Sequence, residues 1–263
     1  MDKKKTLLRR IAGWALWLLV IVAALFALQV TVLAFPQLIV PQSVQVGSVK
    51  LYHDGFPEAE INQLAAEVER RLQASGFYDS SRTHRVFFFK NQGLYTLFAR
   101  LTMVTPLAQG FGLSVFDNSF VSATRVNALG KRTGKFPPYS VWEGDPAHTM
   151  AHEIAHDYMI DRIGRGKWQQ LPQWKQEGFP EYVANIGLIR EDSLATLSNR
   201  FMVLNDDRAW RGRYGWDRIH YEAGLLVEFL IDVQNYRLDE IVADSITRDE
   251  TLAALNAWSG AQQ

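Results

Sequence analysis

Two histidines with a glutamate between them stand out in the stretch HTMAHEIAHDYMI, residues 148–160. On a helix, residues four apart lie on one face, so His152 and His156 would project side by side. Two imidazole nitrogens placed in this way can bind one Zn²⁺. Glu153 would lie about 100° further round the helix, where it is better placed to act as a general base toward a water molecule than to bind the metal.

The same stretch also fits an ordinary amphipathic helix. In that interpretation Met150, Ile154 and Tyr158 face the core, and the histidines pack against neighbours or are solvated. Asp157, which directly follows the second histidine, would either support a metal ligand or be a solvated helix residue. A catalytic zinc usually has three protein ligands and one open position, so the metal hypothesis needs a further ligand elsewhere in the chain.

Two downstream glutamates in WKQEGFPEYV, residues 174–183, could meet that need. The 20 residues between His156 and Glu177 are enough for a loop and a returning helix, which would place Glu177 as the third ligand. Glu181, four residues on, would share the helical face of Glu177. From there it could accept the second ring N–H of a metal-binding histidine and orient that ring.

HEIAH followed by W-x-x-E-G-x-x-E-Y resembles the gluzincin metallopeptidases, which include thermolysin and the zinc aminopeptidases. The resemblance implies a zincin-like α+β fold and hydrolysis of peptide bonds. It implies that His152, His156 and Glu177 bind Zn²⁺ and that Glu153 activates water. In some members an acidic residue four positions after the third ligand orients a histidine, which corresponds here to Glu181.

The resemblance is closest over residues 145–182 and weaker further on, and the Gly-x-x-His continuation of the metzincins is absent. YEAGLLVEFL, residues 221–230, resembles a helix that begins with an active-site tyrosine in many gluzincins. Tyr221 is therefore a candidate donor to the oxyanion that forms during carbonyl attack, with His220 as the alternative. Tyr221 could equally be a packing residue at the start of a helix.

The N-terminal segment predicts a membrane anchor. Residues 11–49 contain no charged side chain, and the apolar stretch of residues 11–35 is long enough to cross a bilayer as a helix. Five basic residues precede it in residues 1–10, which predicts a cytoplasmic N-terminus and an extracytoplasmic domain. A cleaved signal peptide is the alternative, although its apolar region would normally be shorter.

The elements that would position the site follow from the spacing of apolar residues. We expect residues 36–50 to be an extended linker and residues 51–263 to form the metallopeptidase domain. Helices are predicted over 58–74, 94–103, 145–162, 172–189, 221–236 and 249–258, and strands over 85–90 and on both sides of a turn in 111–126. The strand near residues 111–116 would be either the edge strand above the metal or a core strand. Strands that precede helices favour an α+β class.

Composition narrows the possible functions. The 263 residues include 48% hydrophobic and 21% charged side chains, which is typical of a chain with a buried core. Equal numbers of basic and acidic residues argue against nucleic-acid binding. The absence of cysteine excludes disulfides and a cysteine nucleophile. Together with the apolar N-terminal segment, the gluzincin resemblance implies a single-pass membrane protein that hydrolyses a peptide or protein substrate, with its domain in the periplasm if the organism is Gram-negative. The alternative is an inactive gluzincin-like protein that serves as an anchored binding or scaffold module.

Overall fold

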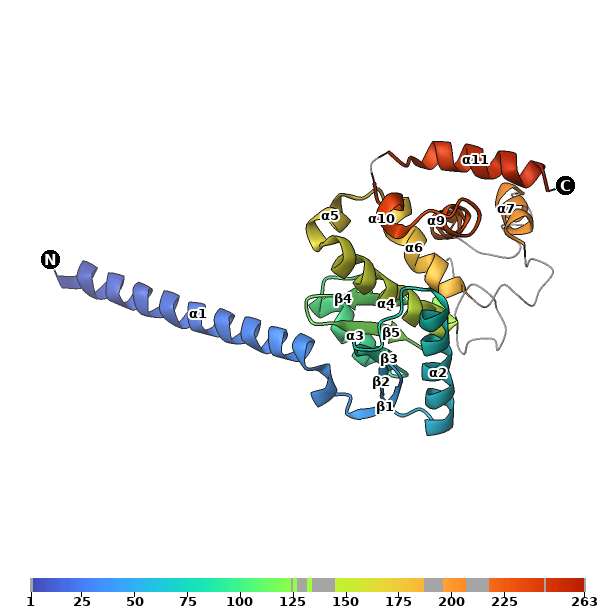
Figure 1. The fold of residues 1–263 in the computed structure, drawn as a ribbon. Coiled ribbons are helices and arrows are strands. Elements are labelled where there is room, and N and C mark those ends of the chain that lie inside the picture. The colour runs from blue at the N-terminus through green and yellow to red at the C-terminus, as the bar shows by residue number, and fades with distance from the viewer. Residues whose placement is uncertain are drawn as a thin grey trace.

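The computed structural model describes residues 2–123, 125–126, 132–133, 145–186, 196–206, 218–243 and 245–262. It is a mixed α+β structure with one apolar N-terminal helix, as the sequence predicted (Figure 1). The predicted helix over 172–189 is observed as a helix over Gln173–Asn185, and residues 187–189 lie outside the described part.

The first helix, α1 (Asp2–Ala34), extends away from the rest of the chain (Figure 1). Its segment Ile11–Ala34 has 24 residues and is long and apolar enough to cross a membrane. The far end of α1 is different in character, because Leu33 is buried against the folded part of the protein. Helix α1 therefore joins the folded domain directly.

The prediction of a linker over residues 36–50 is wrong. These residues form the short 3-10 helix η1 (Pro36–Leu38), strand β1 (Gln42–Val46) and the start of β2 (Val49–His53), and Val40 is fully buried. The prolines and the glycine that suggested an extended linker mark the ends of these short elements. Gly47 (φ 54°) makes the tight turn between β1 and β2.

Five strands form one mixed sheet in the order β1-β2-β3-β5-β4. The central strand β3 (His84–Phe89) pairs in parallel with β2 and with β5 (Asn118–Ser122). Strand β4 (Gly110–Leu113) pairs antiparallel with β5 and lies at the edge of the sheet. The predicted strand–turn–strand over 111–126 is therefore present, and its first strand is the edge strand.

Alternation along β3 explains how the sheet is buried on both faces. Val86 and Phe88 point into one core, which also receives side chains from α2 (Glu58–Ala74) and from the later helices. Phe87 and Phe89 point to the other face, into a second, aromatic core covered by α3 (Gln92–Leu101) and the end of α1. Successive residues of a strand face opposite sides, so a run of apolar residues suits a strand in the middle of three layers.

The helix predicted to hold the histidines is α4 (Pro146–Ile163), which packs on α2 and on β4 and β5. Asp145 caps the start of this helix, since its carboxylate accepts a hydrogen bond from the backbone N–H of Ala147 at 2.9 Å. Gly164 (φ 82°) ends it, and the chain returns through α5 (Arg165–Gln170) into α6 (Gln173–Asn185).

Helix α6 lies against α4 on one side and against α9 (Arg218–Glu228) on the other. Two glycines allow the close approach of α6 and α9. A Cβ atom at Gly178 would lie 2.5 Å from the carbonyl oxygen of Ala223, and one at Gly224 would lie 2.9 Å from Cβ of Glu181. The glycine that follows Glu177 in the motif is therefore required by packing.

The remaining described elements are the two strands of a small hairpin and the helices of the C-terminal part. They are β6 (Arg125–Val126), β7 (Arg132–Thr133), α7 (Leu197–Asn205), the π-helical turn η2 (Phe229–Val233), α10 (Leu238–Ile241) and α11 (Arg248–Gly260). The predicted helix over 221–236 corresponds to α9 with η2, and the predicted helix over 249–258 corresponds to α11.

Candidate metal centre

Helix α4 presents three histidines on one face. His148, His152 and His156 follow one another at intervals of four residues, so their rings lie in a row along the helix. The rings of His148 and His152 are stacked, and those of His152 and His156 meet edge-on. His152 is buried, and the side chain of His156 retains 15% of its accessible surface. The amphipathic interpretation is correct for Met150 and Ile154, which are fully buried in the core, but it does not describe the histidine face.

The carboxylate of Glu177 on α6 meets two of these rings. Its Oε2 atom lies 3.3 Å from Nε2 of His152 and 3.3 Å from Nε2 of His156, and the two Nε2 atoms are 3.1 Å apart. Ligands bound at 2.0–2.1 Å in a tetrahedron lie about 3.3 Å from one another. The two nitrogens and the oxygen thus already have the spacing that one tetrahedral metal ion requires.

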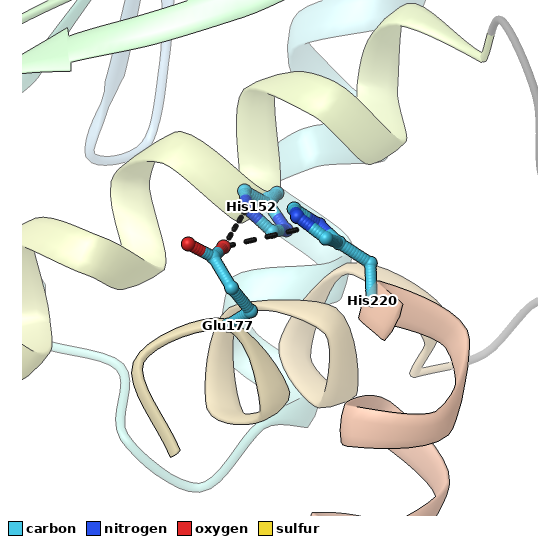
Figure 2. A group of neighbouring side chains, drawn as sticks. All are labelled: His152, Glu177 and His220. Carbon is cyan, nitrogen blue, oxygen red and sulfur yellow. Dashed lines mark ion pairs between the residues drawn. The ribbon is translucent and has the colours of Figure 1, made fainter. Parts of the chain in front are cut away.

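A second, wider group shares two of these residues. His152, Glu177 and His220 each offer one ligand atom, and these atoms lie within 4.8 Å of one another. Figure 2 shows the three side chains converging from α4, α6 and α9. Nδ1 of His220 is 3.8 Å from Oε2 of Glu177. The group with His156 is the tighter one, and His220 lies beside it with 30% of its side chain exposed.

Glu181 connects the histidines behind the candidate ligands. Its Oε1 atom lies 3.1 Å from Nδ1 of His152, which is ion-pair distance although short of a well-aligned hydrogen bond. The same atom is 3.4 Å from Nδ1 of His220, and Oε2 is 3.0 Å from Nε2 of His148. The structure therefore places Glu181 where its spacing predicted, against the ring nitrogen of His152 that does not face Glu177.

His148 is a member of the cluster that the sequence interpretation did not assign. Its only signal was the interval of four residues to His152, which is the same interval that separates the two candidate ligands. By bonding Glu181, His148 helps to hold this carboxylate in place.

Glu153 lies beside the edge strand. A Cβ atom at Gly110 would be 3.1 Å from its Oε1 atom, and one at Gly112 would be 3.4 Å from its Oε2 atom. The bare backbone of β4 thus passes close to this carboxylate. Burial, which Glu177 reinforces and the nearby histidines oppose, raises the pKa of Glu153 above its usual value.

Charges within the cluster stabilise one another. Burial opposes protonation of His152, but the carboxylates of Glu177 and Glu181 outweigh it and raise the pKa of this imidazole. Burial likewise opposes ionisation of Glu177 and Glu181, yet the histidines hold the pKa of both carboxyl groups low. A metal ion binds only neutral imidazole, so its binding would release the proton of His152.

Two further predicted site residues, Tyr221 and Asp157, are both buried. The hydroxyl of Tyr221 is buried and donates a hydrogen bond to the carbonyl oxygen of Arg200 at 3.3 Å, so this side chain packs within the helical core. His220, its neighbour on α9, is the one that faces Glu177. Asp157 is buried, and burial raises its pKa to about 7. Among the residues that the structure describes, no hydrogen bond joins its carboxylate to a candidate ligand.

A buried arginine holds together the helices that carry the cluster. Arg71 on α2 donates to Asp145 Oδ2 at 2.5 Å, to the carbonyl oxygen of Ala184 at 3.1 Å and to Glu67 at 2.8 Å. Asp145 caps α4 and Ala184 lies near the end of α6. One side chain thus links the start of the histidine helix to the end of the glutamate helix.

A scan of the chain against protein-family models gives no match, and a search of curated proteins gives none either. Function must therefore be inferred from the residues of the site. Two imidazoles and one carboxylate with the spacing of metal ligands, a separate buried carboxylate and a partly exposed third imidazole form a set that can bind a metal ion and transfer protons beside it.

Proposed function

We propose that this protein is a membrane-anchored zinc metallopeptidase of the gluzincin type, with its active domain outside the cytoplasm. The observation that carries the proposal is the triangle of 3.1, 3.3 and 3.3 Å between His152 Nε2, His156 Nε2 and Glu177 Oε2. Nitrogen and carboxylate ligands in a tetrahedral arrangement suit Zn²⁺ better than Mg²⁺ or Ca²⁺, which prefer six or more oxygens.

When bound, zinc would supply Lewis-acid activation of water and of the substrate carbonyl. The protein residues supply the proton transfers. Glu153 accepts a proton from the attacking water and passes it to the leaving amine, and its raised pKa suits a group that must both take and return a proton near neutral pH. In this proposal His220, rather than Tyr221, donates to the oxyanion, which is supported by its distance of 3.8 Å from Glu177 and its partial exposure.

Strand β4 supports a peptide as the substrate. It lies at the edge of the sheet, and among the described residues it pairs only with β5. An extended substrate could add to this edge through backbone hydrogen bonds. Gly110 and Gly112 carry no side chain that would keep such a backbone away from Glu153.

The arrangement of elements supports the zincin-like part of the proposal. The histidine helix α4 lies against the edge of a mixed sheet, and a second helix, α6, returns to bring the third candidate ligand to the histidines. The anchor is supported by the uncharged helical segment Ile11–Ala34, and its orientation by the five basic residues before it.

Zinc content tests the metal site. We expect the full-length chain, purified in detergent, to bind about one zinc ion, because three protein ligands form one tetrahedral site. The His156→Ala variant should lose the ion, whereas His220→Ala should keep it. A wild-type chain that folds but takes up no zinc refutes the proposal, and loss of zinc in His220→Ala but not in His156→Ala would assign the metal to the wider group.

Turnover tests the chemistry separately. Glu153→Gln should keep zinc but lose peptide hydrolysis by a factor on the order of 10²–10⁴, the usual contribution of a general base. A mixture of unfolded polypeptides serves as a substrate of undefined sequence, with peptide release followed by mass spectrometry. Equal hydrolysis by the wild type and Glu153→Gln would leave a zinc protein that binds without cleaving.

A further inference from the structure

We propose that the surface around the end of α1 is a membrane-docking surface, which seats the folded domain on the headgroup region of the bilayer that α1 spans. This inference rests on the proposed anchoring by α1. It depends neither on the identity of the metal nor on catalysis.

Exposed apolar side chains gather at this surface. Beyond α1, nine large apolar side chains of the described residues are exposed. Seven of them lie on or next to η1, on α3, or in the turns that follow α3 and β4, which are segments that share a core with the end of α1. Val115 in the turn between β4 and β5 is one, and the other six are Phe35, Leu38, Ile39, Leu97, Met103 and Leu107. We call these seven residues the apolar collar. Single exposed apolar residues are normal on a protein surface, whereas a gathered set indicates a binding surface.

Hydrogen bonds attach the collar segments to α1. The side chain of Gln29 donates to the carbonyl oxygen of Leu101 at 2.6 Å, at the end of α3 and two residues before Met103. The side chain of Asn118 donates to the carbonyl oxygen of Leu33 at 2.8 Å, three residues after Val115. In Figure 1, α1 leaves the domain on the side where α3 and β4 lie, and α7 and α11 lie on the opposite side.

The length of α1 determines where the apolar collar lies relative to the bilayer surface. A helix needs about 20 residues to cross a hydrocarbon core of about 30 Å. Counted from Ile11, the first residue after the basic segment, the core would end near Val30. Gln29 and Leu33 already contact the domain. No spacer separates the bilayer from the domain, so the segments around the end of α1 lie at the membrane surface.

The charge distribution favours lipid as the partner. Arg100 is the only charged residue between positions 91 and 116, and residues 11–49 contain none. A soluble protein partner would be served by a polar rim around an apolar centre. Apolar tips with a single basic residue suit the boundary between acyl chains and anionic headgroups.

Met103 is the most prominent collar residue. Its side chain is 93% exposed, and its backbone lies in the left-handed region with φ 59°, which non-glycine residues seldom adopt. Backbone hydrogen bonds from Met103 to Arg100 and from Val104 to Ala99 hold this turn after α3. The fold therefore holds an apolar side chain outward at the rim of the anchor.

The absence of cysteine allows a direct test in the full-length protein. Met103→Cys and the matched control Met202→Cys, an exposed methionine on α7, are each labelled with an environment-sensitive fluorophore. Both proteins are reconstituted into phosphatidylcholine–phosphatidylglycerol vesicles and recovered by flotation. Quenching is then measured with a nitroxide carried on the lipid and, separately, with aqueous iodide.

We expect the lipid-borne nitroxide to quench the label at position 103 several-fold more strongly than the label at position 202, and iodide to show the opposite order. Equal behaviour of the two labels overturns the proposal, as does a chain that fails to float with the vesicles. A label at position 103 that is shielded from both quenchers, and becomes accessible on dilution with lipid, would show a second copy on the collar and also overturns it. Zinc content and hydrolysis do not enter these readouts.

Discussion

Replacing Arg71 with methionine should weaken the packing of α4 against α6 while leaving every candidate ligand unchanged. The guanidinium is 2% exposed and bonds Glu67, Asp145 and the carbonyl oxygen of Ala184, so it ties α2 to the start of α4 and the end of α6. Methionine fills similar volume but bonds none of these groups. The two carboxylates and the carbonyl then lose their buried donor.

The magnitude follows from the surroundings of these partners. Removing one member of a buried ion pair costs about 3–5 kcal/mol, because the other charge is left uncompensated. Glu67 and Asp145 retain 32% and 24% of their side-chain exposure, so water can solvate them in part. We therefore expect a loss of about 2–4 kcal/mol in the free energy of unfolding. For a domain of this size, that lowers the melting temperature by about 4–16 °C.

Arg70→Met is the matched control. Arg70 pairs with Glu67 from an exposed position, and such a pair contributes at most about 1 kcal/mol, or about 2–4 °C. Thermal unfolding of both variants in detergent, followed by circular dichroism, gives the comparison. Zinc affinity should fall in Arg71→Met and stay unchanged in Arg70→Met, because only the former holds α4 against α6. Equal melting temperatures for the two variants would refute the reasoning.

Three further predictions concern other parts of the molecule. Glu181→Gln should weaken zinc binding about 10–100-fold, because His152 then loses the carboxylate beside its Nδ1 atom. Competition with a chelator measures this change. Burial, with the nearby Arg82 charge, lowers the pKa of His84 from its ordinary value of 6.5 to about 4. At a pH below 6.5 this histidine therefore binds fewer protons in the folded state than in the unfolded state. Stability from this group is full above pH 6.5 and falls by about 3 kcal/mol as the pH drops toward 4, and urea titrations should show a flatter profile in His84→Gln. Gly178→Ala should cost about 1–3 kcal/mol by overlap between α6 and α9, whereas Gly166→Ala, with open space around it, should not destabilise the fold in the same melting assay.

Local sequence pattern predicted the elements whose cause is local. Helix α2 was predicted at its observed ends, residues 58–74, because apolar positions recur with helical spacing and charges occupy the opposite face. The cap at Asp145 likewise has a local cause, because it needs only the side chain of Asp145 and the proline after it. His152 and His156 were paired by an interval that any helix converts into proximity.

The remaining features depend on contacts between distant segments. The neighbours Tyr221 and His220 differ by about 100° around α9, and only the crossing of α9 over α6 decides which of them faces Glu177. Residues 36–50 resemble a linker until β2 provides a partner for β1, and that pairing depends in turn on β3. The role of His148 became visible only once Glu181 had been brought to it by α6.

The direct junction between α1 and the domain also limits how far the domain can move away from the membrane. With α1 in a bilayer, the bonds at Gln29 and Leu33 leave no flexible tether along which the domain could swing into the surrounding compartment. For the proposed peptidase, the search for substrates then becomes two-dimensional. A polypeptide held in the same bilayer needs only lateral diffusion to meet it, whereas a freely dissolved one must first arrive at the surface in a suitable orientation.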